Sequence, residues 1–179
     1  MGSKKKFYYI LGLQSYASHD SGACIIKFDN TNKFLDFVSI SEDRLVRRKH
    51  TYAFPVNSIY KCMKYFNLKK LNEISYVYSD WIKEPKWLRS GPGYNYQMYD
   101  YLKEKFKFDK SKIIQLNHHL CHAASTYYTS GFKKSAILII DGLGSDNETH
   151  SIYKAKDYKI NFLQRYKHRG IGGLYAAIT

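Results

Sequence analysis

Short apolar runs separated by polar turns dominate the first forty positions of the chain. Runs rich in β-branched and aromatic residues occur at 7–14, 22–28 and 34–40, and each has the length of a strand. A small polar loop joins the first two runs, and the turn-forming residues 29–32 join the second to the third. This pattern predicts an antiparallel meander of three strands.

Helices and strands alternate in the middle of the chain. Apolar residues at helical spacing follow Pro55, which suits a first helical turn, and they recur over 98–106. Strands are predicted at 74–78 and 112–116, which makes the pattern β-α-β. Between them, residues 79–93 contain proline and glycine without periodicity and are predicted to form a loop.

The final third of the chain returns to strands. Residues 135–140 are continuously apolar, as expected for a strand covered on both faces. Two further strands are predicted at 149–155 and 160–166. The glycine-rich residues 170–179 open an apolar helix that has no helix-ending signal, so we expect the chain to stop inside a domain.

Composition limits the class of protein. With 179 residues, 44% of them hydrophobic, the chain can form one ordinary core or one lobe of a larger protein. No apolar run approaches the roughly 18 residues of a membrane span, so we expect a cytoplasmic protein without a membrane partner. Cys24, Cys62 and Cys121 are widely spaced and odd in number, which indicates reduced thiols.

The chain is strongly basic. It has 29 Lys and Arg against 15 Asp and Glu, a net charge of +14, which favours anionic partners such as phosphates, nucleotides, RNA or acidic lipid. Charge alone does not choose among these, and most lysines can equally belong to solvated faces. The densest cationic cluster lies between Arg44 and His50 and includes Lys49, which could neutralise a phosphate-bearing substrate or belong to a solvated turn.

A candidate metal site lies in the second half of the chain. His118 and His122 are four residues apart, so on a helix both imidazoles project from one face, while His119 points about 100° away. Asp141 ends an apolar strand, where a carboxylate is costly unless it is paired or bound to a cation. Two histidines and one carboxylate suit Fe(II) or a similar divalent ion. A helix-capping histidine and a turn-forming aspartate are the structural alternative.

Two loops could contact a substrate. Glycines at 142 and 144, directly after Asp141, would let backbone N–H groups approach phosphate oxygens, although many Asp-Gly turns only connect strands. His19 and Asp20, in the loop between the first two strands, form a donor and acceptor pair that could orient a hydroxyl or phosphate. An ordinary polar hairpin loop explains the second pattern equally well.

Four blocks, in order along nearly the whole chain, carry a family resemblance. They are Ile10-Leu11-Gly12-Leu13 with Ser18-His19-Asp20-Ser21-Gly22-Ala23-Cys24-Ile25, then Glu42-Asp43-Arg44 with Arg47-Arg48-Lys49-His50 and Phe54-Pro55, then His118-His119-Leu120-Cys121-His122-Ala123-Ala124-Ser125, and finally Ile140-Asp141-Gly142 with Gly144. Together these blocks resemble the O-carbamoyltransferases, a family of nodulation and antibiotic-tailoring enzymes. The histidine block is the most specific of the four.

The resemblance implies an α/β fold of the actin/Hsp70-like (RNase H-like) type, in which two related lobes with mixed sheets flank a nucleotide. We therefore expect a basic tail at 1–6, a first lobe at 7–134 and the truncated start of a second lobe at 135–179. The rest of the second lobe and a downstream YrdC-like domain would be the missing partners of this fragment. The segment 81–96 has no confident counterpart in the family pattern.

The resemblance also implies chemistry. In the family, the YrdC-like domain joins carbamoyl phosphate to ATP, and the N-terminal domain transfers the carbamoyl group from carbamoyl adenylate to a small-molecule hydroxyl acceptor. His118, His122 and Asp141 match three ligands of an Fe(II)-type site, and a fourth aspartate would lie beyond Thr179. His19 and Asp20 match the first active-site loop, and we expect them to contact acceptor or carbamoyl group. Asp141, Gly142, Gly144 and Lys49 are the residues expected to hold the nucleotide.

Two other functions remain open from the sequence. The same lobe could be a non-catalytic basic module that binds a nucleotide, RNA or a partner subunit. The enzyme could also act on tRNA, as in the related threonylcarbamoyl system, although the continuation of the histidine block resembles the small-molecule branch. On that ground a nucleic-acid substrate is not expected.

Overall fold

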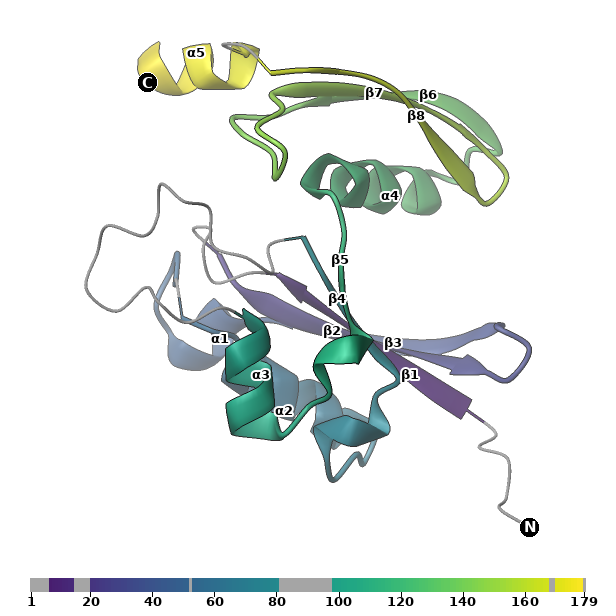
Figure 1. Cartoon of the computed structure of the whole chain (residues 1–179), viewed down its shortest axis with the longest axis vertical. Helices are drawn as coiled ribbons and strands as arrows, with labels where there is room; N and C mark the ends of the chain where they lie inside the picture. Colours follow the sequence, from purple (N-terminus) through teal and green to yellow (C-terminus); the bar gives the residue numbers. More distant parts are fainter. Residues whose placement is uncertain (1–6, 15–19, 52, 81–97, 168–169, 179) are drawn as a thin grey trace. The chain divides into compact units, whose positions relative to one another are not determined.

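The computed structural model describes residues 7–14, 20–51, 53–80, 98–167 and 170–178 (Figure 1). Within them the chain forms two compact units, residues 1–115 and 116–179. Each unit combines a sheet with helices, which confirms the predicted α/β class with a mixed sheet. No helix in the described ranges is both long and apolar enough to cross a membrane.

The first unit contains a five-stranded sheet. Its strands are β1 (Phe7–Gln14), β2 (Gly22–Asp29), β3 (Phe34–Ser41), β4 (Tyr76–Ser79) and β5 (Ile113–Gln115), arranged in the order β3-β2-β1-β4-β5. The first three strands pair antiparallel, as the predicted meander requires. β4 then pairs parallel to β1, and β5 parallel to β4, so the sheet is mixed.

Helices cover one side of this sheet in Figure 1. They are α1 (Glu42–Val46), α2 (Val56–Tyr65) and α3 (Met98–Phe106), with short 3-10 turns at Leu71–Glu73 and Lys110–Lys112. The core beneath them is fully buried at Leu11, Ile25, Ile59, Val77 and Leu102. The alternation of each strand and the helical spacing of α2 bring these side chains to a common interior.

Helix α1 was not predicted from the sequence, and it supplies the cap of another helix. The Glu42 side chain is buried, and its carboxylate accepts hydrogen bonds from Ser58 N at 2.7 Å and Ser58 Oγ at 2.6 Å. Asn57 donates to the other carboxylate oxygen through its side-chain amide at 2.6 Å. A carboxylate at these N–H groups satisfies donors that the first turn of α2 leaves unpaired.

The second unit contains a three-stranded antiparallel sheet in the order β6-β7-β8. Its elements are α4 (His118–Ser130), β6 (Lys134–Ile140), β7 (His150–Lys156), β8 (Lys159–Tyr166) and α5 (Ile171–Ile178). Helix α4 packs through Ala123 and Tyr127 against Ile137, Ile139 and Tyr153 of the sheet. This small core sits on one side of the sheet only.

One detail of the second unit differs from the sequence-based expectation. Strand β6 is not covered on both faces, because Leu138 is 61% exposed and Ile140 48% exposed while Ile137 and Ile139 are buried. The compact units divide after Gln115, and the predicted lobes at 7–134 and 135–179 stay a prediction. Helix α4 belongs to the second unit because its apolar face packs on β6 and β7.

Candidate metal centre

The candidate ligands are positioned by the start of helix α4. Asn117 caps this helix, and its side-chain oxygen accepts a hydrogen bond from Leu120 N at 2.9 Å. The helix therefore begins at His118, whose own backbone N–H donates to Ser145 Oγ at 3.0 Å. Histidines 118 and 122 then lie one turn apart on the same side of the helix.

The structure brings the three predicted ligands together. His118 Nε2 lies 3.0 Å from His122 Nε2 and 2.9 Å from Asp141 Oδ2, and His122 Nε2 lies 3.7 Å from the same carboxylate oxygen. Asp141 is contributed by the loop that follows β6, and its backbone N–H donates to Thr149 O at 2.9 Å. All three donor atoms belong to the second unit.

These separations fit a shared ion. Ligand atoms that each lie about 2.1 Å from one metal are roughly 3.0 Å apart at octahedral angles and roughly 3.4 Å apart at tetrahedral angles. The three observed separations of 2.9, 3.0 and 3.7 Å bracket those values. His118 is mostly buried, Asp141 is partly buried, and His122 is half exposed, so one side of the cluster stays open.

Asp141 shows a second sign of a cation site. Its Oδ1 accepts a hydrogen bond from Gly142 N at 2.6 Å, whereas Oδ2 is buried and makes no hydrogen bond of good geometry with any described residue. The imidazoles of His118 and then His122, with the Gly142 N–H, hold the pKa of Asp141 well below its usual range against the effect of burial. The carboxylate is therefore charged, with one oxygen directed at the histidines.

His119 is the residue of this site that the sequence reasoning missed. Helical spacing predicts that it points about 100° away from His118, yet its fully buried imidazole reaches to 3.7 Å from Asp141 Oδ2. Its Nδ1 lies 2.7 Å from Ser151 Oγ of β7. Burial lowers the pKa of His119, and the nearby carboxylates of Glu148 and Asp141 oppose that effect. The only sequence signal was its position inside the histidine block.

A buried carboxylate organises the loop after Asp141. Glu148 is fully buried and accepts hydrogen bonds from Asn117 Nδ2 at 2.6 Å and from Asp146 N at 2.6 Å. Asp146 in turn forms an ion pair with Arg165 of β8. Because Asn117 also caps α4, this network fixes the loop that carries Asp141 against the helix that carries the histidines.

The two glycines of the loop play different local roles. A Cβ at Gly144 would lie 2.6 Å from Glu148 Oε1, so only glycine allows this carboxylate to pack against the loop. A Cβ at Gly142 would meet nothing within 4 Å, and the Gly142 N–H is already bonded to Asp141. The predicted approach of these two N–H groups to a phosphate remains a prediction.

The other candidate residues belong to the first unit. His19 lies outside the described residues. Asp20 is described, and its Oδ1 lies 3.5 Å from Nδ1 of the exposed His50. Lys49 is exposed in the turn after α1. The expectation that these residues contact substrate or nucleotide stays a prediction.

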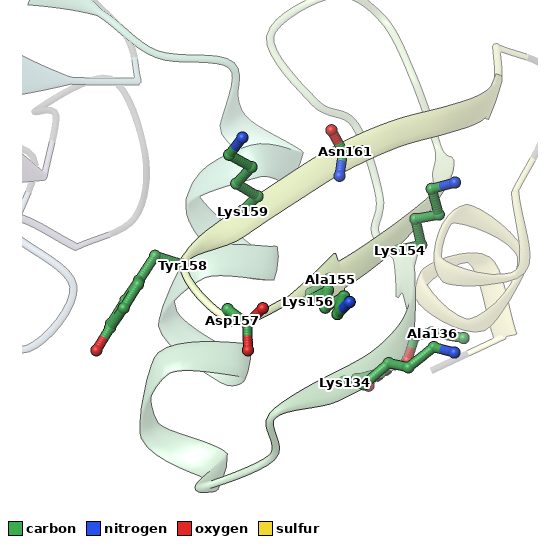
Figure 2. Close-up of a pocket in the computed structure, with 10 residues that line it drawn as sticks. Lys134, Ala136, Lys154, Ala155, Lys156, Asp157, Tyr158, Lys159 and Asn161 are labelled. Carbon is green, nitrogen blue, oxygen red and sulfur yellow. Dashed lines mark hydrogen bonds between the residues drawn. The ribbon is translucent and has the colours of Figure 1, made fainter.

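A hollow of about 840 Å³ lies on the opposite side of the second unit's sheet from α4 (Figure 2). Strand register sets Lys134, Lys156 and Lys159 side by side across three strands, with Lys154 opposite Asn161 in the neighbouring row. No ion pair joins any of these lysines to a carboxylate in the described part of the chain. Four lysines and one acidic residue, Asp157, line the hollow, so its charge is predominantly positive. It lies on the other face of the sheet from α4, which carries the histidines.

Known proteins resemble this chain in sequence. The family model described as "Carbamoyltransferase N-terminus" matches residues 67–179, more than half of the chain. An uncharacterised protein of Synechocystis (sll1178) is 24% identical over 96% of this chain and 31% of its own length. Nodulation protein NolNO of Sinorhizobium fredii is 28% identical over 75% of this chain and 21% of its own length.

Two further similarities are more limited. An uncharacterised protein of Methanocaldococcus jannaschii (MJ1058) is 44% identical over 31% of this chain and 9% of its own length. The chain thus spans less than a third of each of these three relatives. Among solved structures, YeaZ from Pseudomonas aeruginosa is similar with a TM-score of 0.49 and 10% identity, over 88% of this chain and 64% of that chain.

Proposed function

The chain belongs to the carbamoyltransferase N-terminus family, and from this premise we propose that it carries part of the metal and nucleotide site of an O-carbamoyltransferase. The parent enzyme would move a carbamoyl group from carbamoyl adenylate to the hydroxyl of a small-molecule acceptor. The chain would act together with the remainder of the second lobe and a YrdC-like domain that uses ATP and carbamoyl phosphate. The similarity to NolNO, a nodulation protein, agrees with the family's nodulation enzymes.

One observation carries the proposal. His118 Nε2, His122 Nε2 and Asp141 Oδ2 converge within 4.8 Å of one another, and the carboxylate oxygen among them is buried without a hydrogen bond of good geometry. A charged buried oxygen beside two imidazoles is stable when a cation is shared among them. Two neutral histidines and one carboxylate, with positions left open, form a donor set that suits Fe(II).

Each candidate residue would have its own role in this proposal. His118, His122 and Asp141 would hold a divalent metal, with Fe(II) as our first choice. Such an ion supplies Lewis acidity where negative charge develops on phosphate or carbamoyl oxygens. Asp141 would contribute a full negative charge to the site, while Gly142 and Gly144 would shape the loop beside the nucleotide. Lys49 would supply positive charge towards phosphate, and His19 with Asp20 would orient the acceptor hydroxyl.

Metal uptake tests the site directly. The purified protein would be loaded anaerobically with Fe(II), desalted and measured by elemental analysis, with wild type compared against the double variant His118→Ala/His122→Ala. We expect about one equivalent in the wild type and a loss of stoichiometric uptake in the double variant, with unchanged circular dichroism. His50→Ala removes a more exposed imidazole from the first unit and serves as the matched control, which should retain the metal.

Two results would contradict the metal site. Equal metal content in the wild type and the double variant would show that these imidazoles do not hold the ion. Equal losses in the double variant and in His50→Ala would indicate surface binding by histidines in general. Carbamoyl transfer is tested separately in the parent enzyme, which would supply the proposed second-lobe remainder and YrdC-like domain, by following labelled carbamoyl phosphate into hydroxyl acceptors in the presence of ATP. A metal-loaded parent enzyme that never transfers the label would count against the reaction.

The basic hollow supports a second candidate function, the binding of RNA or a nucleotide without catalysis. Lys134, Lys156 and Lys159 are direct cross-strand neighbours, an arrangement in which like charges repel. An anionic partner would relieve that repulsion. Figure 2 shows the lining residues on all three strands, with Lys134 and Ala136 on β6, Lys154 and Lys156 on β7, and Lys159 and Asn161 on β8.

Salt-dependent RNA binding distinguishes this candidate. The pair of substitutions Lys154→Glu and Lys156→Glu should weaken binding and lower its salt dependence, because fewer counterions are released. Lys61→Glu with Lys64→Glu, at two exposed positions of α2, gives the same charge change outside the hollow. RNA retention that depends on the first pair alone, without metal uptake, would favour the binding module. Equal losses from both pairs would indicate non-specific attraction by the net charge.

A further inference from the structure

Two buried polar atoms at the candidate metal site, one of them on the proposed ligand Asp141, lie side by side without a hydrogen bond between them. His119 Nε2 and Asp141 Oδ2 are inaccessible to solvent, and neither makes a hydrogen bond of good geometry with a described residue, although His118 Nε2 also lies 2.9 Å from Asp141 Oδ2. They lie 3.7 Å apart. Buried polar atoms in native proteins are nearly always paired, so two such atoms side by side call for an explanation.

The chemistry of the two groups makes them complementary. An ionised carboxylate only accepts hydrogen bonds, so the imidazole nitrogen that faces it is best suited as a donor. The other ring nitrogen of His119 lies 2.7 Å from Ser151 Oγ, a hydroxyl that can donate to it. Ser151 is itself buried, and strand register places it opposite Ile139, two residues before Asp141.

We propose that His119 is a positioning residue, which donates its Nε2–H to Asp141 Oδ2 and so directs that carboxylate towards the ion held with His118 and His122. Ser151 fixes the tautomer by donating to Nδ1. This inference rests on the proposed metal site. It assigns a role to His119, the histidine of the block that is not a proposed ligand. Metal-bound carboxylates commonly have such outer partners, and losing one typically weakens metal binding 10- to 100-fold.

The geometry defines what must move. A hydrogen bond requires the two heavy atoms to come within about 3.2 Å, so the present separation must shorten by roughly 0.5 to 1 Å. The other oxygen of Asp141 is held by Gly142 N at 2.6 Å. A small rotation of the carboxylate about that contact brings Oδ2 towards His119 while leaving a lone pair for the metal.

Three substitutions of His119 separate its two contacts. In His119→Gln, the side-chain amide places an N–H donor near the position of the imidazole Nε2, facing Asp141. In His119→Asn, the shorter side chain keeps a polar atom near Nδ1, facing Ser151, but has no donor for Asp141. His119→Leu removes both contacts and keeps an apolar side chain of similar bulk in the buried space.

The expected pattern is a selective loss of affinity. Fe(II) affinity, measured anaerobically by competition with a chelating indicator, should fall 10- to 100-fold in His119→Leu and His119→Asn. It should stay within about threefold of wild type in His119→Gln, which retains the donor. Thermal melting of the metal-free proteins reports any effect on the fold, and a purely structural role would lower the melting temperature without this separation between Gln and Asn.

Each other outcome has a distinct meaning. A wild-type protein that binds no Fe(II) overturns the proposed metal site and this inference with it. If the wild type binds Fe(II) and His119→Leu and His119→Asn bind it equally tightly, only the positioning role is overturned. Loss of affinity in His119→Gln as large as in His119→Leu, with intact folds, also overturns it, because the donor would then be irrelevant.

A measurement on the wild type tests the proposal even if the variants fail to fold. In ¹⁵N-labelled protein loaded with Zn(II) as a diamagnetic probe, the ring nitrogens of His119 report its tautomer. The expected result is a protonated Nε2 and an unprotonated Nδ1. Protonation at Nδ1 instead would turn a lone pair towards Asp141 and would contradict the proposed hydrogen bond.

Discussion

Asp141 Oδ2 lies 2.9 Å from His118 Nε2, although the two residues come from a loop and a helix that the chain connects through an entire strand. Both positions are fixed by neighbours that have no place in the metal cluster. The Asn117 side chain caps the helix and donates to Glu148, and Glu148 holds the loop. The distance between the two ligands thus depends on a buried polar network beneath them.

Removing the charge of Asp141 should weaken metal binding without unfolding the protein. Asp141→Asn keeps the shape of the side chain, but a neutral amide is a poorer ligand and no longer offsets the charge of a divalent ion. We expect Fe(II) affinity to fall by at least about tenfold, measured by competition with a chelator. Asp157→Asn is the matched control, because Asp157 has a positive φ of 54° that asparagine also tolerates. Similar losses in both variants would refute a specific role for Asp141.

The sequence was sufficient to predict that the side chains of His118, His122 and Asp141 lie close together. Helical spacing fixes the relative direction of the two imidazoles, and an apolar strand fixes where the aspartate emerges. Both signals are local in the chain. Whether these local directions meet depends on α4 packing against β6, and the apolar faces of those two elements made that packing a reasonable expectation.

Other features depended on information that no local pattern contains. The place of His119 follows from the register between β6 and β7, which sets Ser151 opposite Ile139. Likewise, the apolar run of β6 is typical of a strand buried on both faces, but Leu138 is exposed because α4 covers only one side. Helix α1 has only five residues, too few for periodicity to reveal it.

Replacing Gly142 and Gly144 by alanine, one at a time, should change the stability of the protein by different amounts. Gly144→Ala places a Cβ 2.6 Å from Glu148 Oε1, so the buried carboxylate must shift and its hydrogen bonds to Asn117 and Asp146 are strained. We expect the free energy of unfolding to fall by roughly 1 to 3 kcal/mol, measured by urea denaturation. Gly142→Ala meets nothing within 4 Å and should change stability by less than about 0.5 kcal/mol.

The same two variants also test the predicted phosphate contact. If Gly142 permits close approach of a phosphate, Gly142→Ala should weaken nucleotide binding while leaving urea stability unchanged. Titration of ATP into metal-loaded protein, followed by calorimetry, measures this effect. An unchanged ATP affinity in Gly142→Ala would show that Gly142 does not contact the nucleotide.

Truncating Glu42 should destabilise the first unit. The change Glu42→Ala leaves Ser58 N, Ser58 Oγ and the Asn57 side chain without their shared acceptor in a buried position. Loss of a helix cap and of buried hydrogen bonds should lower the free energy of unfolding by about 2 to 3 kcal/mol. Lys103→Ala, at an exposed position of α3, is the control for chemical denaturation. A change no larger than that of the control would show that the cap contributes little.

The buried thiol of Cys62 predicts a stability loss at alkaline pH. Burial, followed by the nearby Cys24, raises the pKa of Cys62 to about 11, and its Sγ donates to Ala23 O at 3.5 Å. The unfolded thiol titrates near its ordinary value of 9.0, so between pH 9 and 11 the folded protein binds more protons than the unfolded chain. The contribution of this thiol to stability is therefore present below pH 9 and is lost as the pH rises towards 11, by roughly 2 kcal/mol in all.

Comparing pH slopes isolates this thiol from the tyrosines and lysines that titrate in the same range. Urea denaturation of wild type and Cys62→Ala at several pH values should show a shallower alkaline decline in the variant, whatever the cost of the lost side chain at neutral pH. Thiol labelling of the native wild type at pH 8 gives an independent check. Cys62 should react slowly, because only about one thiol in a thousand is ionised at that pH when the pKa is about 11. Parallel slopes for the two proteins would show that the thiol titrates alike in the folded and unfolded states.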